Sequence, residues 1–489
     1  MEKIKILTIG DIHYSTKPAE IESRKTLYGI ELLKRVIRRA TFEERPDIIF
    51  LLGDILNEIS DDMEPLLTEI KKIIDKTDIP CVSIPGNHDG DYERFFHTFK
   101  EKPGAHLFKD ILIYSFADTY GEGDICTRSK QDIERFLSTV KRYPDKKVIV
   151  LQHNPVYPLI ESPYPYNISN AEKVHLSYRE SNVFLSLSAH YHPGQELICK
   201  DGVYYLTVPA LCDSPFGYLL IEIEGNDIKV QRDHLKNPLP LCDNHCHTQF
   251  AYCSEDITID KILERVEILG MGYVSFTEHA DQLYLTEEEY GKALSFYQPD
   301  ILRRKREEGK DRMDLFKQAV NKVKSEKVRI GLEVTPGKDG GISLLPEDRE
   351  GLDIIVGAIH FLPEEIMSTS SAKREVWFMD MVEVLMKNNV DVLAHPFRVF
   401  LRSGLPVPDT LFRPVVDILK SYNVAAELNF HTNIPEYRFF EMCLQEGIKI
   451  SLGTDTHNLI EAGEFYPHIR FLGKLGILPD MLEKVLYTL

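Results

Sequence analysis

Short apolar runs that end abruptly in aspartate, histidine or asparagine recur along the first half of the chain. One run covers residues 79–84 and is followed by Pro85-Gly86-Asn87-His88-Asp89. A β-branched apolar run of this length predicts a buried strand, and Pro-Gly-Asn predicts the turn that ends it. Polar residues just after a strand face the open edge of an α/β sheet, where such folds place their chemistry. The chain is therefore expected to be an α/β protein with a functional loop at 85–89.

Four further predicted strands end in the same kinds of residue. Each side chain alone could be a capping aspartate or a buried histidine. Five strand ends in succession instead predict converging oxygen and imidazole ligands for divalent transition metals. The four other ends are Asp11 and His13 after residues 3–9, Asp54 after 47–52, His153 after 147–151, and His190 and His192 after 183–187.

The order Asp-x-His, Gly-Asp, Gly-Asn-His-Asp, His and x-His-x-His resembles the calcineurin-like metallophosphoesterases over nearly the whole first half. The resemblance implies a four-layer α-β-β-α sandwich with two metal ions bridged by Asp54. It places His88 beside the phosphate as a proton donor or charge stabiliser. Ala189 stands where the family usually has glycine. This departure costs little, because neither alanine nor glycine ligates a metal. The implied ligands are Asp11, His13 and His192 for one ion, and Asn87, His153 and His190 for the other.

Two ions about 3.5–4 Å apart can bind phosphoryl oxygens, acidify a water and stabilise the leaving oxygen. The segment between His153 and His190 is rich in proline and tyrosine. It is either a wall that shapes the substrate site or a plain rigid connection.

A domain boundary is expected near residue 235. Residues 217–223 and 227–230 predict an antiparallel hairpin that closes the first sheet. Residues 235–240 follow as a short extended segment with two prolines. We therefore expect one domain at 1–235 and a second at 241–489.

The second half alternates strand and helix seven times, with polar residues at the strand ends. His245 and His247 stand directly after the proline segment, two residues apart on one side of an extended backbone. Seven β-then-α units predict a closed parallel barrel with its ligands at the carboxyl ends of the strands.

These motifs resemble the PHP family (polymerase and histidinol phosphatase), with 275–279 and 453–457 most like its histidinol-phosphatase branch. The resemblance implies a distorted (β/α)7 barrel with three metal ions. Asp256, or its neighbour Glu255, matches a further family carboxylate. Arg398 could contact phosphate or form a surface salt bridge, and Glu427 and Asn429 could support the ligands or the substrate. The implied ligands are His245, His247, Asp256, His279, Glu333, His360, His395, Asp455 and His457.

Composition narrows the class of protein. The 489 residues suffice for two cores, and no run approaches the ~20 apolar residues of a membrane span. Residues 1–9 predict a first strand rather than a signal peptide. Eight cysteines without a Cys-x-x-Cys pair favour a reducing, cytoplasmic setting. The net charge of −19 argues against tight non-specific nucleic-acid binding.

These observations predict an enzyme with two metal-dependent phosphoester sites acting on small phosphorylated substrates, with Mn, Fe or Zn as cofactor. The fusion suggests the hypothesis that one site opens a diester and the other removes the resulting monoester phosphate. The alternatives are a nucleic-acid-processing enzyme, or one active domain beside a metal-binding regulatory module. Histidinol phosphate is a further candidate substrate for the second half. The basic run 303–306 is either a solvated helix face or a lid that attracts an anionic substrate.

Overall fold

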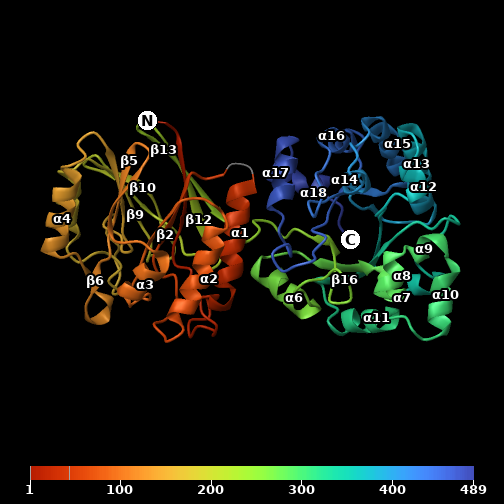
Figure 1. The fold of residues 1–489 in the computed structure, drawn as a ribbon, viewed down its shortest axis with the longest axis horizontal. Helices are drawn as coiled ribbons and strands as arrows, with labels where there is room; N and C mark the ends of the chain where they lie inside the picture. The colour runs from red at the N-terminus through yellow and green to blue at the C-terminus, as the bar shows by residue number, and fades with distance from the viewer. Residues whose placement is uncertain (1, 43–44) are drawn as a thin grey trace. The chain divides into compact units, whose positions relative to one another are not determined.

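The computed structural model describes residues 2–42 and 45–489. The chain divides into two compact units, Met1–Lys236 and Asn237–Leu489. In Figure 1 the first unit runs from red to yellow-green and the second from green to blue. No helix within the described residues combines the length and the apolar character needed to cross a membrane.

Two sheets with parallel central strands form the first unit. The strand at 48–52 is buried along its whole length, as expected where both faces of a sheet are covered. The five-stranded sheet has the order β13-β12-β1-β2-β3 and the six-stranded sheet the order β10-β11-β9-β8-β5-β4. The strands are β1 (Ile4–Ile9), β2 (Ile48–Leu52), β3 (Cys81–Ile84), β4 (Gly104–Phe108), β5 (Ile111–Ser115), β8 (Lys147–Leu151), β9 (Val183–Ser188), β10 (Gln195–Lys200), β11 (Val203–Thr207), β12 (Gly217–Glu224) and β13 (Asp227–His234), with a small hairpin of β6 (Thr119–Tyr120) and β7 (Cys126–Thr127).

Apolar side chains fill the space between the two sheets. Phe50 from the five-stranded sheet and Ile149 from the six-stranded sheet belong to this core. A second core joins the six-stranded sheet to α4 and α5 through Phe136 and Val174. Figure 1 shows α1 and α2 on the opposite side of the sheets from α4. The layers are therefore α-β-β-α, which confirms the expected sandwich. Its helices are α1 (Gly29–Phe42), α2 (Met63–Asp75), α3 (Tyr92–Phe99), α4 (Lys130–Val140) and α5 (Ala171–Arg179).

Local signals explain where these elements begin and end. The Ser129 hydroxyl accepts a hydrogen bond from the backbone N–H of Asp132, 3.0 Å away, and so caps α4. The predicted hairpin is confirmed: β12 and β13 pair antiparallel from Gly217 opposite His234 to Glu224 opposite Asp227.

A seven-stranded parallel sheet forms the second unit, with its strands in sequence order from β14 to β20. A parallel bridge between Cys246 and Thr456 brings the last strand beside the first, so the barrel is nearly closed. This confirms the expected barrel. The strands are β14 (Asp243–Cys246), β15 (Val274–His279), β16 (Val328–Val334), β17 (Ile354–Gly357), β18 (Val392–Leu393), β19 (Ala425–Leu428) and β20 (Ile450–Leu452).

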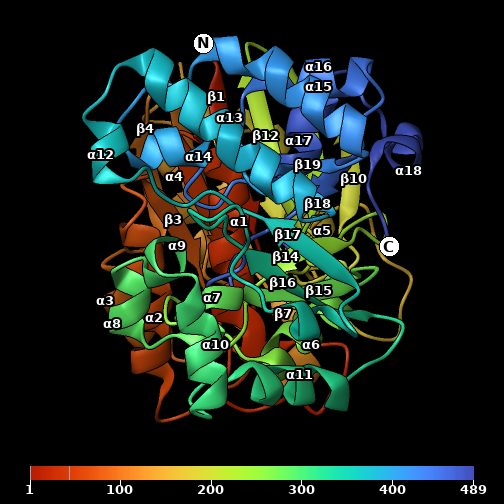
Figure 2. The ribbon, with the colours of Figure 1, turned by 90° about the vertical axis from the view of Figure 1, so that its right-hand side faces the viewer.

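Helices surround these strands in Figure 2, with α13 and α15 above and α10 and α11 below. Thr258 caps α6 by accepting a hydrogen bond from the backbone N–H of Lys261. The helices are α6 (Ile259–Ile268), α7 (Ala280–Tyr284), α8 (Glu287–Gly291), α9 (Leu294–Tyr297), α10 (Asp300–Glu307), α11 (Met313–Lys322), α12 (Glu364–Met367), α13 (Ser371–Lys387), α14 (Arg398–Arg402), α15 (Phe412–Tyr422), α16 (Tyr437–Gln445), α17 (Tyr466–Lys474) and α18 (Leu482–Val485).

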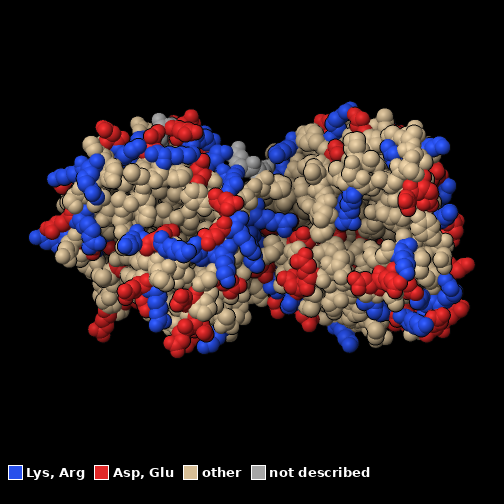
Figure 3. Space-filling model, in the orientation of Figure 1, with Lys and Arg blue, Asp and Glu red and all other residues tan. Residues whose placement is uncertain are grey.

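The basic run 303–306 lies on α10 and is paired with acidic side chains. Arg303 contacts Glu347, and Lys305 contacts Glu289. These contacts favour the interpretation as an ion-paired helix face over that of a lid. On the face drawn in Figure 3, positive and negative side chains lie interspersed over each unit.

Candidate metal centres

The predicted residues of the first unit meet where the parallel strands of both sheets end. Several have left-handed backbones: φ is 51° at Asp11, 47° at His13, 49° at Asp54 and 66° at His190. Non-glycine residues keep this conformation where the surrounding structure imposes it, and such strain clusters at functional sites. The residues at these strand ends are Asp11, His13, Asp54, Asn87, His88, His153, His190 and His192.

The Asp54 carboxylate lies at the centre of this group. Its Oδ2 is 3.5 Å from His13 Nε2 and 3.2 Å from His153 Nε2. Its Oδ1 accepts a hydrogen bond of 2.9 Å from the backbone N–H of His88. The ligand atoms of His13, Asp54 and His88 lie within 4.8 Å of one another, as do those of Asp54, His153 and His190. Asp54 thus belongs to both sets, as a bridging ligand would.

Buried polar atoms without partners mark the same place. Within the described residues, both ring nitrogens of His13, Oδ1 of Asn87 and Nε2 of His153 and His190 make no hydrogen bond. Each such atom costs roughly 1–3 kcal/mol if it stays unsatisfied. Imidazole nitrogens beside carboxylate and amide oxygens suit divalent transition metals. The donor set therefore fits the metal ions that the sequence motifs imply.

Charge and burial set the protonation of the two aspartates differently. Burial alone would raise the pKa of Asp54, but the nearby charge of His153 holds that pKa well below its usual range. Burial raises the pKa of Asp11 to about 6, although the charge of His192 lowers it. A cation bound between them would favour the ionised form of both carboxylates.

Asp89 ties two of the ligand loops together, a role that the sequence pattern did not indicate. Its carboxylate accepts backbone hydrogen bonds from Ile55 (3.2 Å), Leu56 (2.9 Å) and Gly86 (2.8 Å). These contacts hold the turns after β2 and β3 against each other. A buried carboxylate that accepts several backbone hydrogen bonds keeps the residues beside it in a fixed position.

Two histidines are oriented through the nitrogen that faces away from the centre. His192 Nδ1 lies 2.6 Å from Asp213 Oδ2. His153 Nδ1 lies 2.7 Å from the carbonyl oxygen of Leu52. Such contacts fix the tautomer and the ring orientation, and they leave Nε2 as the ligand atom.

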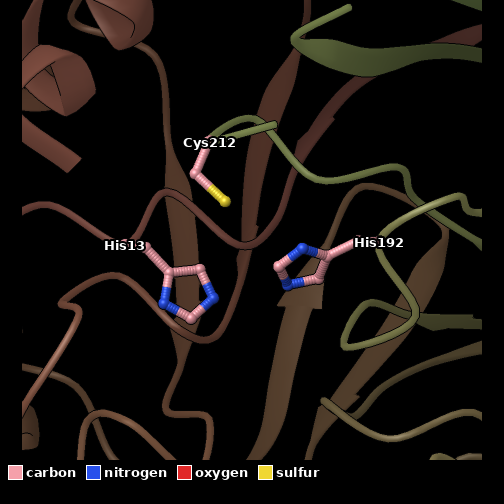
Figure 4. A group of neighbouring side chains, drawn as sticks. All are labelled: His13, His192 and Cys212. Atoms are coloured by element: carbon pink, nitrogen blue, oxygen red, sulfur yellow. The ribbon is translucent and has the colours of Figure 1, made fainter. Parts of the chain in front are cut away.

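A thiol and a guanidinium, neither expected from the sequence, lie near His13. Figure 4 shows Cys212 beside His13 and His192, with its sulfur directed toward them, and the three ligand atoms are within 4.8 Å of one another. The Cys212 carbonyl accepts a hydrogen bond of 2.9 Å from the backbone N–H of Lys25. Burial lowers the pKa of His13 well below its usual range, and the positive charge of Arg24 adds to that effect.

In the second unit, the predicted ligands line the carboxyl ends of the barrel strands. His395 (φ 28°) and Asp455 (φ 51°) again have left-handed backbones. The ligand atoms of His247, His279 and His457 lie within 4.8 Å of one another, as do those of His245, Glu333 and His395.

Glu333 is the central carboxylate of the barrel site. Its Oε2 is 2.6 Å from His279 Nδ1, and its Oε1 is 3.1 Å from His395 Nε2 and 3.4 Å from His360 Nε2. Within the described residues, Nε2 of His245, Nε2 of His360 and Nδ1 of His395 make no hydrogen bond. This second donor set also fits divalent metal ions.

Two glutamates contact the predicted ligand histidines on the side away from the centre of the site. Glu427 Oε1 lies 2.8 Å from His245 Nδ1, and Oε2 accepts a hydrogen bond from the backbone N–H of His395, which confirms the supporting role expected for Glu427. Glu278 Oε1 lies 3.1 Å from His247 Nδ1. Carboxylates in this position orient the ring and raise its basicity as a ligand.

Asp256 lies exposed, and its Oδ1 accepts a hydrogen bond of 2.9 Å from the backbone N–H of Leu459. Cys253, in the same loop, has its sulfur 3.5 Å from His279 Nε2. Burial opposes ionisation of the thiol, but hydrogen bonds with His279 and His457 lower its pKa to about 4. The ligand role of Asp256 remains a prediction, and the Cys253 thiol lies nearer to a predicted ligand, His279, than the sequence motifs indicated.

Arg398 and Asn429 both contact Asp455. The Arg398 guanidinium is buried and contacts the Asp455 carboxylate and His395 Nε2. Asn429 Nδ2 donates to Asp455 Oδ2 over 3.3 Å. Arg398 therefore forms a buried ion pair rather than a surface salt bridge, and the substrate-binding roles of both residues remain predictions. Nearby, Arg402 donates to the Thr432 hydroxyl over 3.0 Å.

Residues 4–194 match the family model described as calcineurin-like phosphoesterase, and residues 243–431 match that of the PHP domain. The chain is 25% identical over 165 residues to the "Probable glycerophosphodiester phosphodiesterase GpdQ" of Arcobacter nitrofigilis, covering 31% of this chain and 56% of that protein. It is 31% identical over 125 residues to the "DNA double-strand break repair protein Mre11" of Nanoarchaeum equitans, covering 24% and 33%.

Among solved structures, a dimetal phosphatase from Danio rerio aligns with 47% of this chain and 98% of its own, at 13% identity and a TM-score of 0.39. The chain spans 33% to 56% of the lengths of the curated relatives named above.

Proposed function

Because the chain joins a calcineurin-like phosphoesterase domain to a PHP domain, we propose that it is a hydrolase with two separate metal-dependent phosphoester sites. The observation that carries this proposal is the pair of buried donor sets, one in each unit, whose imidazole nitrogens lack partners among the described residues. When bound, the ions would supply Lewis acidity toward phosphoryl oxygens and an acidified water. We propose two ions in the first site and three in the second, from Mn, Fe and Zn.

In the first site, His88 is proposed to hold a proton or a positive charge beside the substrate phosphate. Its Nδ1 lies 2.6 Å from the carbonyl oxygen of Asn57, which orients the ring. Its backbone N–H is bonded to Asp54. In the second site, Arg398 and Asn429 are proposed to bind the substrate phosphate. A metal held by Asp455 would supply positive charge to that carboxylate.

The substrates are proposed to be small phosphate esters, with a diester opened in the first unit and a monoester hydrolysed in the second. The name of the Arcobacter relative supports diester chemistry in the first unit. The two domains, 1–235 and 241–489, are proposed to act as separate catalytic units. The eight cysteines are all unpaired in the structure, which supports a reducing compartment such as the cytoplasm.

The test measures phosphate and alcohol release from generic monoesters and diesters by Mn-supplemented protein. Asn87→Ala should remove one activity and His245→Ala the other, while His97→Ala, at an exposed histidine, should change neither. If Asn87→Ala and His245→Ala each spare both activities, the proposal is wrong. If one variant removes both, the other unit is a regulatory module.

A nucleic-acid-processing role is the second candidate, because the Nanoarchaeum relative is named as a DNA repair protein. The net charge of −19 weighs against a basic nucleic-acid track. Salt-dependent binding of single-stranded DNA, with cleavage that is lost in Asn87→Ala, would favour this candidate over the small esters.

A further inference from the structure

Tyrosine rings gather around His190 at the edge of the first donor set. The ring centroids of Tyr164 and Tyr166 lie 5.6 and 5.7 Å from that of His190. The two tyrosine rings are 4.9 Å apart, and Tyr191 lies 5.0 Å from Tyr166. His190 shares its donor set with Asp54, so this aromatic cluster adjoins the proposed hydrolytic centre.

The segment that carries Tyr164 and Tyr166 is fixed by hydrogen bonds of its own. The Asn167 amide nitrogen donates to the carbonyl oxygens of Pro155 (3.2 Å) and Pro158 (3.1 Å), and its Oδ1 accepts from the backbone N–H of Ile160 (2.8 Å). Asn154 Nδ2 donates to the Tyr166 carbonyl oxygen over 2.9 Å. A segment held this way presents its side chains at little cost in ordering entropy when a ligand binds.

Tyr164 differs from its neighbours in exposure. It is 36% exposed, whereas His190 is 5% exposed. Its hydroxyl donates to Asp124 Oδ2 over 3.1 Å, so the ring is anchored at its tip as well as at its backbone. An aromatic ring that is fixed, partly open to solvent and beside a metal-site histidine is suited to stacking rather than to core packing.

We propose that Tyr164 stacks against a planar aromatic group of the substrate, either a nucleobase or an aryl ring, while the ester phosphate lies at the first metal site. This inference rests on the proposed function of that site, and it adds the class of substrate. Stacking of a base on an aromatic side chain contributes enough to change affinity about tenfold. Tyr166, which itself packs against Tyr191, contacts Tyr164 beside His190.

The experiment measures dissociation constants by calorimetry with the full-length, Mn-supplemented protein. Two pairs of ligands share a methyl phosphodiester, the ester class proposed for the first site, and differ in the ring: the methyl ester of adenosine 5′-monophosphate against that of ribose 5-phosphate, and methyl phenyl phosphate against dimethyl phosphate. At least one ring-bearing ligand should bind about tenfold tighter than its partner. Tyr164→Leu should remove that preference, while Tyr164→Phe, which keeps the ring and loses the bond to Asp124, should retain most of it.

A preference in the nucleotide pair alone identifies a base, and one in both pairs identifies a general aromatic pocket. Equal affinities within both pairs, or a preference that survives in Tyr164→Leu, would overturn the inference. The binding readout is separate from turnover. Protein that binds these ligands with the expected preference but hydrolyses no ester would refute the proposed function and leave the stacking site standing.

Discussion

Both donor sets bury carboxylates that need positive charge beside them, and the two units supply that charge differently. In the first unit, Asp11 and Asp54 follow neighbouring strands of the five-stranded sheet, and the facing six-stranded sheet contributes His153 and His190. Positive charge beyond the histidines comes from a bound ion or from Arg24 nearby. In the second unit, one barrel mouth gathers the ligands, and the buried guanidinium of Arg398 already contacts Asp455. The pKa of Asp455 is held well below its usual range, against the effect of burial, first by that guanidinium.

The two units therefore differ in the positive charge that lies beside their buried carboxylates before a metal binds. A barrel site with its own arginine can keep a carboxylate ionised in the metal-free protein. The sandwich site leaves Asp11 with a pKa of about 6. Metal removal should therefore favour protonation of Asp11 in the first site, whereas Asp455 in the second site should stay ionised.

The largest effect is expected from the two central carboxylates. Asp54→Asn and Glu333→Gln should each lower a different esterase activity more than a thousandfold, because each removes charge that holds the ions which stabilise the transition state. Steady-state rates on a monoester and a diester, with bound metal measured by mass spectrometry, would check this. Loss of both activities in either variant would contradict the comparison, because both activities would then depend on the same site.

A loss of about 3–5 kcal/mol in free energy of unfolding is expected for Arg398→Met in metal-free protein, because Asp455 then keeps a buried charge without its partner. Added Mn²⁺ should restore part of that loss. Denaturant unfolding with and without metal measures it. Arg413→Met is the matched control, since Arg413 pairs with Asp417 and Glu446 in an exposed position and should matter little. Equal losses in the two variants would contradict the proposed charge balance.

Strand ends were the part of both sites that the sequence could predict. Alternation of apolar runs with polar termini is enough to place His153 or Glu333 at the carboxyl end of a strand, and the motif order supplied both folds. Residues that act from a distance along the chain carry no such signal. Asp89, Asp213 and Cys253 are ordinary turn or loop residues in sequence, and their contacts depend on how loops meet in three dimensions.

The smallest expected effect concerns Glu101, which accepts a hydrogen bond of 2.9 Å from the backbone N–H of Ser83 in β3. Burial raises the pKa of Glu101 from 4.5 to about 7. Between these values the folded state holds a proton that the unfolded state has released, so stability falls as pH rises from about 4.5 to 7, by on the order of 2 kcal/mol.

Glu101→Gln should flatten that dependence. Hydrogen exchange of peptides from β3 at pH 5 and pH 7.5, corrected for intrinsic exchange, would measure it, with α13 peptides of the barrel as the internal reference. Equal protection of wild-type β3 from hydrogen exchange at the two pH values would contradict the expected pH dependence of the first unit.

The left-handed backbones at the strand ends have a consequence for protein engineering. A strained residue of this kind costs on the order of 1–3 kcal/mol, and Asp11, His13 and Asp54 all carry it. Glycine or asparagine at such positions would relieve the strain, so any search that selects for thermal resistance alone will tend to replace them. The thermally stable variants that emerge should have lost activity, because the positions where replacement stabilises most are those of the proposed metal ligands.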